Sequence, residues 1–477
     1  MNRTSALYFF IITFVCAGIA GILHLGNKLP ANSPPAISSA VQTPAASPSV
    51  FASVEAGLRQ NANDPLSRLF LQLLVIITAS RLAGWLFTRF GQPAVVGEMA
   101  AGILLGPSLF GLLAPDLFQF VFPVTSLGAL KLFSQIGVCL FMFAVGMDLD
   151  VAQVRNKAQT AVLVSHASIV VPYFLGVVLA LFFYSEFAQP GASFTAFALF
   201  MGISMSITAF PVLARILQER GLSKTVLGST AITCAAVDDV TAWSVLAFVV
   251  AIVRASSVGA AMFSLSLVLI FVALMLWVVK PGLPRWIGES ALEQAAPSKG
   301  VLAAVVGVVL AAALTTELLG IHALFGAFLT GAIMPTKGDF RHKLSVRVEN
   351  FSSVLLLPLF FAFTGLRTQF GMLNDLRGWL LCLAIIAVAT TGKLGGTALT
   401  ARLTGLPWRE SLQLGALMNT RGLMELIALN IGYDLGILSP PIFTMLVIMA
   451  LATTAMTGPL LTLFEARRAL PVPVPAH

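Results

Sequence analysis

The sequence predicts an all-α protein that crosses a membrane many times, and three observations indicate this fold class. Of the 477 residues, 58% are hydrophobic and 10% are charged, too few polar residues to cover a water-soluble protein of this length. The apolar residues gather in runs of spanning length, roughly 17 to 25 residues or more. Short motifs from the first half of the chain recur in the second half, which indicates an internal repeat.

The first apolar run, 5–26, stands apart from the others. Because Arg3 precedes it, this run is either a cleaved signal peptide or a retained anchoring helix, and we favour the retained helix. The stretch that follows is rich in Pro, Ser and Ala, which is typical of an unstructured tether. About thirteen further runs are predicted to span the membrane, at 67–89, 92–114, 127–147, 159–184, 191–217, 225–253, 258–280, 300–319, 321–336, 347–368, 378–402, 409–435 and 440–466.

The basic residues are divided unequally between the two sides of the membrane. When the thirteen runs are threaded alternately, one side receives little beyond Arg254, Arg367 and Arg377. The positive-inside rule assigns the other, basic side to the cytoplasm, together with the C-terminus. The net charge of +8 comes from single residues between apolar runs rather than from basic patches, so we expect no nucleic-acid partner. The scattered cysteines and histidines indicate no disulfide framework and no metal centre.

Two pairs of motifs carry the internal repeat. GEMAAGILLGP, from Gly97 to Pro107, matches GAFLTGAIMP, from Gly326 to Pro335, and LFMFAVGMD matches LFFAFTGLR. With six runs per copy and one linking helix, the copies cross the membrane in opposite senses, which is the plan of secondary transporters. We therefore expect an N-terminal hydrophobic helix or signal peptide (1–26), an external tether (27–65), a first inverted repeat (66–257), a linking helix and cytoplasmic loop (258–298), a second inverted repeat (299–468) and a short cytoplasmic tail (469–477).

Two adjacent acids, Asp238 and Asp239, lie in the middle of the run 225–253. A rise of about 1.5 Å per residue puts them about 20 Å from either end of that helix, too deep for their side chains to reach water. An acid at the bilayer centre costs about 2.5 to 3.5 kcal/mol even on the mild insertion scale, and adjacent acids repel one another. We therefore expect the pair to have either a cationic partner or a role in the function of the protein.

Lys393, the only base in its apolar run, is the candidate partner of the acids. An ion pair that locks two helices together is the structural interpretation, and transport is the functional one. Both hold together if one acid pairs with the lysine while the other stays open to a monovalent cation and to protons. Cations and protons would then compete for one site, which is already an exchange mechanism.

Two runs are interrupted at corresponding positions. In the run 191–217, Pro211 follows Ser206 and Thr208, so the helix must lose hydrogen bonds where hydroxyl groups are available. The runs 191–217 and 409–435 are the fifth runs of the two repeats. Interruptions at corresponding positions of two repeats indicate the midplane site of a transporter. In the second run, 409–435, the interruption comprises Asn419, Thr420, Arg421 and Gly422.

Further charges lie in apolar runs, at Glu98, Arg421 and Glu425. We interpret Glu98 and Glu425 as members of salt bridges that support the scaffold, with gating as the alternative. His166 and His322 lie nearer to the ends of their runs and are interpreted as packing residues rather than proton relays.

Several motifs, in order, resemble one known family: SITAFPVLARIL, AAVDDVTAW, IHALFGAFLTGAIMP, LPLFFAFTGLR and MNTRGLMELI. They resemble the monovalent cation:proton antiporter-2 family, close to the bacterial sodium/proton antiporters and to the plant and fungal cation/proton exchangers. The resemblance covers roughly residues 66 to 466 and excludes the N-terminal run and the tether.

The resemblance implies a sodium/proton antiporter fold of about thirteen helices in the bacterial inner membrane, usually a homodimer whose six-helix core moves like an elevator. Asp239 would bind Na⁺ or K⁺ and protons, and Asp238 would pair with Lys393. The crossing of the unwound helices would be lined by Ser206, Thr208, Asn419, Thr420 and Arg421. Two acids together with the lysine imply electrogenic exchange of two protons for one cation. No cofactor is implied, and the short tail after Arg468 departs from relatives with a cytoplasmic nucleotide-binding domain.

Two other functions compete with antiport as explanations of the buried acids. An intramembrane aspartyl protease also uses two buried acids, but takes them from separate helices with motifs that Tyr433-Asp434 and Asp339 do not reproduce. We therefore expect no enzyme. An ion channel or a sodium-coupled symporter of an organic solute on a similar fold stays open as the alternative.

Overall fold

The computed structural model describes Val54, Gly57, Leu58 and the ranges 60–148, 158–222, 225–254, 258–288, 297–336 and 339–464. The predicted N-terminal helix, most of the predicted tether and the tail 469–477 lie outside the described residues. The chain divides into two compact units, Met1–Asn61 and Ala62–His477, and every helix discussed below belongs to the second unit.

The described residues form helices, with one isolated β-bridge between Ala188 and Leu438. Within them, ten helical segments are long and apolar enough to cross a membrane, and Ala94–Leu104 and Ala323–Ala332 are shorter apolar helices. The prediction of an all-α, multi-pass membrane protein is therefore confirmed. The total of thirteen spans and the two inverted repeats stay predictions.

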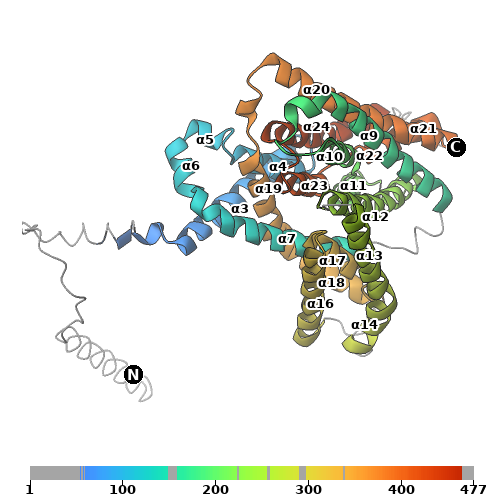
Figure 1. Ribbon diagram of the computed structural model, residues 1–477, viewed down its shortest axis with the longest axis horizontal. Helices are drawn as coiled ribbons and strands as arrows, with labels where there is room; N and C mark the ends of the chain where they lie inside the picture. Colours follow the sequence, from blue (N-terminus) through green and yellow to red (C-terminus); the bar gives the residue numbers. More distant parts are fainter. Residues whose placement is uncertain are drawn as a thin grey trace, which may run out of the picture. The chain divides into compact units, whose positions relative to one another are not determined.

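The helices contact one another in two main groups (Figure 1). The first, which we call the core group, comprises α9 (Ala158–Phe187), α10 (Phe194–Ser206), α11 (Phe210–Glu219), α12 (Val226–Arg254), α20 (Leu376–Thr390), α21 (Gly396–Leu403), α22 (Trp408–Met418), α23 (Leu423–Asp434) and α24 (Pro440–Phe464). The second, the scaffold group, comprises α3 (Pro65–Arg89), α4 (Ala94–Leu104), α7 (Leu127–Asp148), α16 (Lys299–Leu318), α17 (Ala323–Ala332), α18 (Phe340–Phe351) and α19 (Leu357–Arg367). Two short helices between α4 and α7 are α5 (Phe110–Leu113) and α6 (Pro115–Val121), and α12 is followed by α13 (Val258–Leu274) and α14 (Lys280–Ile287).

Local sequence signals set where several helices begin and end. Asp64, Ser193 and Asp375 each accept a hydrogen bond from a backbone N–H in the first turn of α3, α10 and α20, which satisfies donors that a helix start leaves free. The predicted end of the run 92–114 is wrong, because the helix formed there, α4, stops at Leu104. Gly106 and Pro107 follow directly, and proline disfavours helical geometry in the residue before it.

Glycines of the predicted repeat motifs pack crosswise between the helices of the scaffold group. A Cβ atom on Gly365 of α19 would overlap the backbone oxygen of Gly102 on α4. Likewise, a Cβ atom on Gly331 of α17 would overlap the backbone oxygen of Phe143, one turn from Gly146 on α7. The second helix of each predicted repeat thus packs closely on the third helix of the other, as two copies related by a two-fold axis would.

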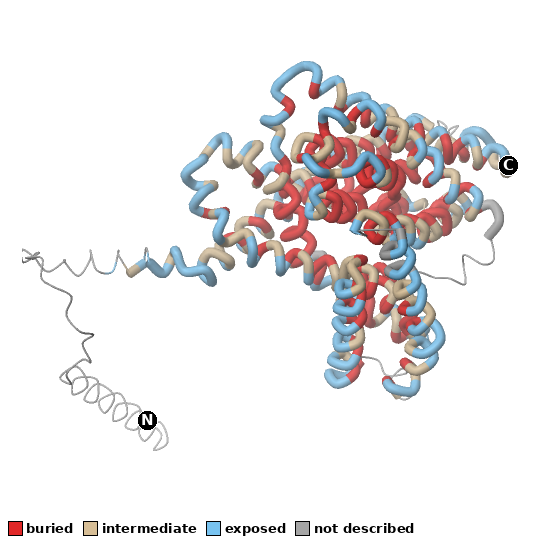
Figure 2. Tube along the Cα trace, viewed as in Figure 1, coloured by how far each residue is buried: buried red, intermediate tan, exposed pale blue. Residues whose placement is uncertain are grey.

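Burial is concentrated in the helices that carry the interruptions. In Figure 2, buried residues cluster in the core group, and α10 and α23 bury almost their whole length. By contrast, α16 exposes Leu310, Leu314 and Leu318, at 58%, 61% and 79%. Large apolar side chains at such exposure suit contact with lipid tails. The broken helices therefore lie in protein rather than in lipid, which is where irregular backbone is tolerated at membrane depth.

Candidate functional site

The first interruption separates α10 from α11. Helix α10 ends at Ser206, and Pro211 occupies the second position of α11. Proline has no N–H and its ring clashes with the carbonyl four residues earlier, here that of Ile207, which favours a kink or a break in the helix at this point. Between the two halves, Ile207 and Ala209 have extended backbone conformations.

The second interruption, between α22 and α23, crosses the first. The backbone N–H of Ala209 donates to the carbonyl of Thr420 at 3.0 Å. The hydroxyl of Thr208 donates to the carbonyl of Met418 at 3.1 Å. Gly422 allows this approach, because a Cβ atom there would lie 2.9 Å from Val212 on α11. The two interruptions therefore satisfy part of one another's backbone hydrogen bonding, which neither could do within its own helix.

Asp238, fully buried on α12, is held by three donors at this crossing. Its Oδ1 accepts from the Ser168 hydroxyl at 2.8 Å. Its Oδ2 accepts from the backbone N–H of Thr208 at 2.9 Å and from Lys393 Nζ at 3.3 Å. Neither Asp238 nor Lys393 is exposed. The carboxylate thus ties α12 to α9, to the first interruption and to the π-helical turn Thr391–Gly395 that carries Lys393.

Asp239 is also fully buried, yet neither of its carboxylate oxygens has a hydrogen-bond partner among the described residues. The backbone N–H of Phe210, at the start of α11, approaches this carboxylate without completing a hydrogen bond. At the second interruption, both side-chain polar atoms of fully buried Asn419 also lack a hydrogen-bond partner within the part of the chain that the structure describes. Buried polar groups normally have partners, so such groups indicate a place for a ligand or water.

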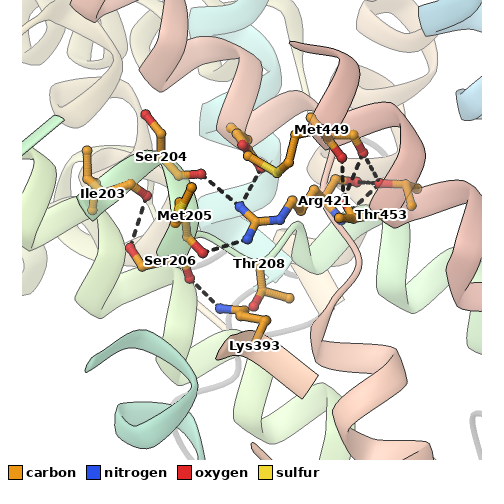
Figure 3. A network of polar contacts seen from close by, with 12 residues as sticks. Ile203, Ser204, Met205, Ser206, Thr208, Lys393, Arg421, Met449 and Thr453 are labelled. Carbon is orange, nitrogen blue, oxygen red and sulfur yellow. Dashed lines mark hydrogen bonds and ion pairs between the residues drawn. The ribbon is translucent and has the colours of Figure 1, made fainter. Parts of the chain in front are cut away.

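Two cations cap the broken end of α10, as Figure 3 shows. Arg421 donates from Nη1 to the carbonyl of Ser204 at 2.8 Å and from Nη2 to that of Met205 at 2.5 Å. Lys393 donates to the carbonyl of Ser206. The last carbonyls of a helix have no intrahelical donors and carry the negative end of its dipole. Arg421 and Lys393 therefore stabilise a helix end that would otherwise be buried unsatisfied.

The remaining predicted residues lie around this centre. The Ser206 hydroxyl bonds within α10, to the carbonyl of Ile203 at 3.0 Å. Thr420 donates to Thr457 of α24 at 3.3 Å. Glu425 forms a fully buried ion pair with Arg421 at 2.9 Å. The role of Glu425 as a supporting charge stays an interpretation, and Ser206 contributes its carbonyl to the site rather than its hydroxyl.

Glu98 lies away from the acid pair, in a cavity of about 500 Å³ between the two groups of helices. Its carboxylate is 3.5 Å from Arg81. The scaffold group lines the cavity with residues of α3, α4, α7, α18 and α19, and the core group with Ala209, Phe210 and residues of α11 up to Gln218. The cavity thus reaches the first interruption, beside Asp239.

Sequence reasoning missed two hydroxyl side chains that organise the site. Ser168 of α9 supports Asp238, and Thr454 of α24 brackets the backbone of Arg421, accepting from its N–H at 3.0 Å and donating to its carbonyl at 2.8 Å. Their only sequence signal is a hydroxyl in an apolar run, and many such hydroxyls here merely bond to the preceding turn of their own helix. The sequence also gave no indication of a cluster at the far ends of α19 and α23, around Arg367 and Asp434.

A multi-pass helical protein in which a buried acid pair meets two crossing, interrupted helices belongs to the class of secondary transporters. Residues 75–464 match the family model described as sodium/hydrogen exchanger, transmembrane, and the chain belongs to this family.

Similarity to individual proteins agrees with the expected resemblance. The chain is 44% identical over 406 residues to the Na⁺/H⁺ antiporter NhaS4 of Synechocystis sp., across 85% of this chain and 97% of that protein. It is 40% identical to cation/H⁺ antiporter 17 of Arabidopsis thaliana and 32% identical to K⁺/H⁺ antiporter 1 of Saccharomyces cerevisiae, across 83% and 84% of this chain. These matches cover 48% and 46% of the plant and yeast proteins, so the chain spans about half their length.

Among solved structures, the fold is similar to that of the sodium proton antiporter MjNhaP1 from Methanocaldococcus jannaschii at pH 8. The TM-score is 0.58 and the sequence identity 15%, across 82% of this chain and 96% of that one. At this identity the likeness concerns the fold alone. The predicted sodium/proton antiporter fold is confirmed.

Proposed function

We propose that the chain exchanges Na⁺ or K⁺ for protons and that Asp239 is the residue to which both bind. One observation carries this proposal: Asp239 is fully buried and its two oxygens have no hydrogen-bond partner among the described residues, while its neighbour Asp238 is held by three donors. A bare carboxylate charge in such a place is costly unless a proton or a cation neutralises it. Either occupant excludes the other, so each turnover exchanges one for the other.

Asn419 is proposed as a neutral ligand of the cation. Monovalent cations need several oxygen ligands, and one carboxylate supplies too few. Asn419 lies between Met418 and Thr420, whose carbonyls bond to the first interruption next to the acid pair. Its unpartnered amide oxygen would complete part of the coordination shell without adding a second charge.

Alternating access would follow from movement of the core group against the scaffold group. The acid pair, Lys393 and both interruptions belong to the core group, and the cavity that reaches Phe210 lies between the groups. By the distribution of basic residues, this cavity is on the cytoplasmic side, where Arg215 lines it. The conformation is then inward-facing, and an elevator-like shift would present Asp239 to the other side.

The exchange is proposed to be electrogenic, with two protons entering for each cation that leaves. Asp238 and Lys393, both fully buried, provide the second group that can change its protonation. A negative interior would then drive export with about 2.3 kcal/mol per 100 mV for the one net charge moved. Equal rates at zero and negative potential would contradict this stoichiometry.

We further propose that the protein works as a homodimer in the bacterial inner membrane with its C-terminus in the cytoplasm, and that it catalyses no chemical reaction. Cross-linking in native membranes tests the dimer, and protease protection of a tag on the C-terminus tests the orientation.

The central experiment is transport in liposomes that contain a pH dye. A pH gradient is imposed, Na⁺ or K⁺ is added, and the native protein is compared with Asp239→Asn. The matched control is Glu186→Gln, which removes a carboxylate from a half-exposed pair with Arg377 on the core group. We expect a cation-evoked pH change in the native protein and the control, and none in Asp239→Asn.

The same experiment separates the alternatives. A channel would carry the cation without a coupled proton flux, and a symporter would respond to an organic solute together with sodium. A response of Asp239→Asn equal to the native one would refute the assignment of the site.

A further inference from the structure

A cluster of polar contacts bridges the scaffold group and the core group at the side opposite the cavity. Arg367, at the end of α19, donates from Nη2 to Asp434 at 2.7 Å and from Nη1 to the Asn430 amide oxygen at 2.8 Å. Both acceptors belong to α23 of the core group. Lys131 of α7 adds a second ion pair to Asp434, at 3.3 Å. Arg367 thus binds residues on two successive turns of α23, the helix that follows the second interruption.

The surroundings of Arg367 give its contact with α23 a better-defined geometry than an exposed ion pair has. Its guanidinium lies over the rings of Phe363 and Tyr433, at 4.3 and 5.0 Å, and its side chain is 15% exposed. Partly buried, stacked arginine contacts of this kind hold a defined geometry, whereas most exposed pairs contribute little.

A neutral hydrogen bond lies on the inner side of the arginine. The Asn430 amide donates to the hydroxyl of Thr364, again between α23 and α19, at 2.9 Å. Asn430 therefore uses its oxygen for Arg367 and its nitrogen for Thr364. The charged and the neutral contacts together close one continuous stretch of the boundary between the groups.

The boundary between the scaffold group and the core group has cavities of different size on its two sides. On one side the cavity of about 500 Å³ separates α11 from α4 and α7. On the other, the described residues around Ile427 and Asn430 line a smaller hollow, of about 30 Å³. A site between two groups that is open on one side and closed on the other is what alternating access requires.

We propose that Arg367, Asn430 and Asp434, supported by Thr364 and Lys131, form the outer gate of this transporter. The gate rests on the proposed alternating access: it holds the outer side closed in the present conformation and its contacts break when Asp239 faces outward. Every contact joins the scaffold group to the core group, so relative movement of the groups must change all of them. By contrast, the Arg377–Glu186 pair joins two helices of the core group and would move as one body.

The test measures access to Ile427, which is 2% exposed and lines the hollow beside the gate. Ile427→Cys is introduced after the native cysteines have been replaced, and a membrane-impermeant thiol reagent is added outside cells. Its rate of modification is compared in the presence of Asp434→Asn, Arg367→Gln and the control Arg377→Gln. A gate-breaking variant should raise the rate about tenfold, the factor that about 1.4 kcal/mol of conformational bias produces.

Thr364→Val provides a milder variant that keeps every charge, and we expect it to raise the rate by a smaller factor in the same direction. Rates for the gate variants equal to that of Arg377→Gln, or acceleration only when the reagent is inside, would overturn the gate. The measurement is repeated with Asp239→Asn, where the acceleration should persist although antiport is lost. Antiport retained in Asp239→Asn would refute the proposed ion site, while the access rates would still decide the gate.

Discussion

Replacing Lys393 by methionine removes one charge from the crossing while keeping most of the side-chain volume. The ammonium lies 3.3 Å from Asp238 and also donates to the carbonyl of Ser206. At this distance and an effective dielectric constant of about 20, the charge pair alone interacts by roughly 5 kcal/mol. Removing one partner of a buried pair typically costs about 3 to 5 kcal/mol of unfolding free energy.

The structure places the expected loss near the lower end of that range, at about 3 kcal/mol. Asp238 keeps two donors after the substitution, the hydroxyl of Ser168 and the backbone N–H of Thr208. The carboxylate is therefore not left bare, although the end of α10 loses its donor at Ser206. Removing the acid as well should relieve most of the remaining cost.

The assay is a double-mutant cycle of Lys393→Met and Asp238→Asn, with thermal unfolding of the purified protein as the readout. We expect a coupling free energy of about 2 to 3 kcal/mol, the upper end for groups in contact. Asp434→Asn with Lys393→Met is the control, because these residues share no contact. Losses that add within about 0.5 kcal/mol for Lys393 and Asp238 would refute the inference that this ion pair holds the crossing together.

Three further predictions address the site and the gate. Asn419→Ala should raise the KM for the transported cation about tenfold, since a lost ligand of about 1.4 kcal/mol has this effect; an unchanged KM would exclude Asn419 from the coordination shell. Arg421→Lys should lower the unfolding free energy by about 1 to 3 kcal/mol, because the single nitrogen of lysine does not reproduce the two separate guanidinium nitrogens that donate to the carbonyls of Ser204 and Met205; Arg377→Lys is the control, and equal melting temperatures would contradict the argument. A disulfide between Thr364→Cys and Asn430→Cys should stop transport until it is reduced, and full transport by the cross-linked protein would show that the outer side need not open.

The two adjacent acids have different environments because they lie on different faces of α12. A helix turns by about 100° per residue, so neighbours cannot share one set of partners. Asp238 points to donors from α9, from the first interruption and from Lys393, and is held by all of them. The Asp239 carboxylate completes no hydrogen bond with any of the described residues. This difference supports the proposal that Asp239 binds the transported ion while Asp238 holds the structure of the site.

The sequence by itself determined the class of protein and the depth of the acid pair. Long apolar runs indicate membrane-spanning segments from composition alone. Counting residues along the run 225–253 places the two acids at its midpoint. The interruptions were also predictable, because Pro211 and Gly422 act on their own stretch of backbone.

Only the tertiary structure showed which donors hold Asp238 and which contacts cross the boundary between the helix groups. Ser168 is 70 residues from Asp238, Lys393 is 155 residues from it, and Thr364 is 66 residues from Asn430. Nothing in the local sequence of either partner encodes such a contact, since it depends on how helices pack and rotate against one another. Arg367 and Asp434 resemble ordinary charges at helix ends until the fold brings them within 2.7 Å of one another.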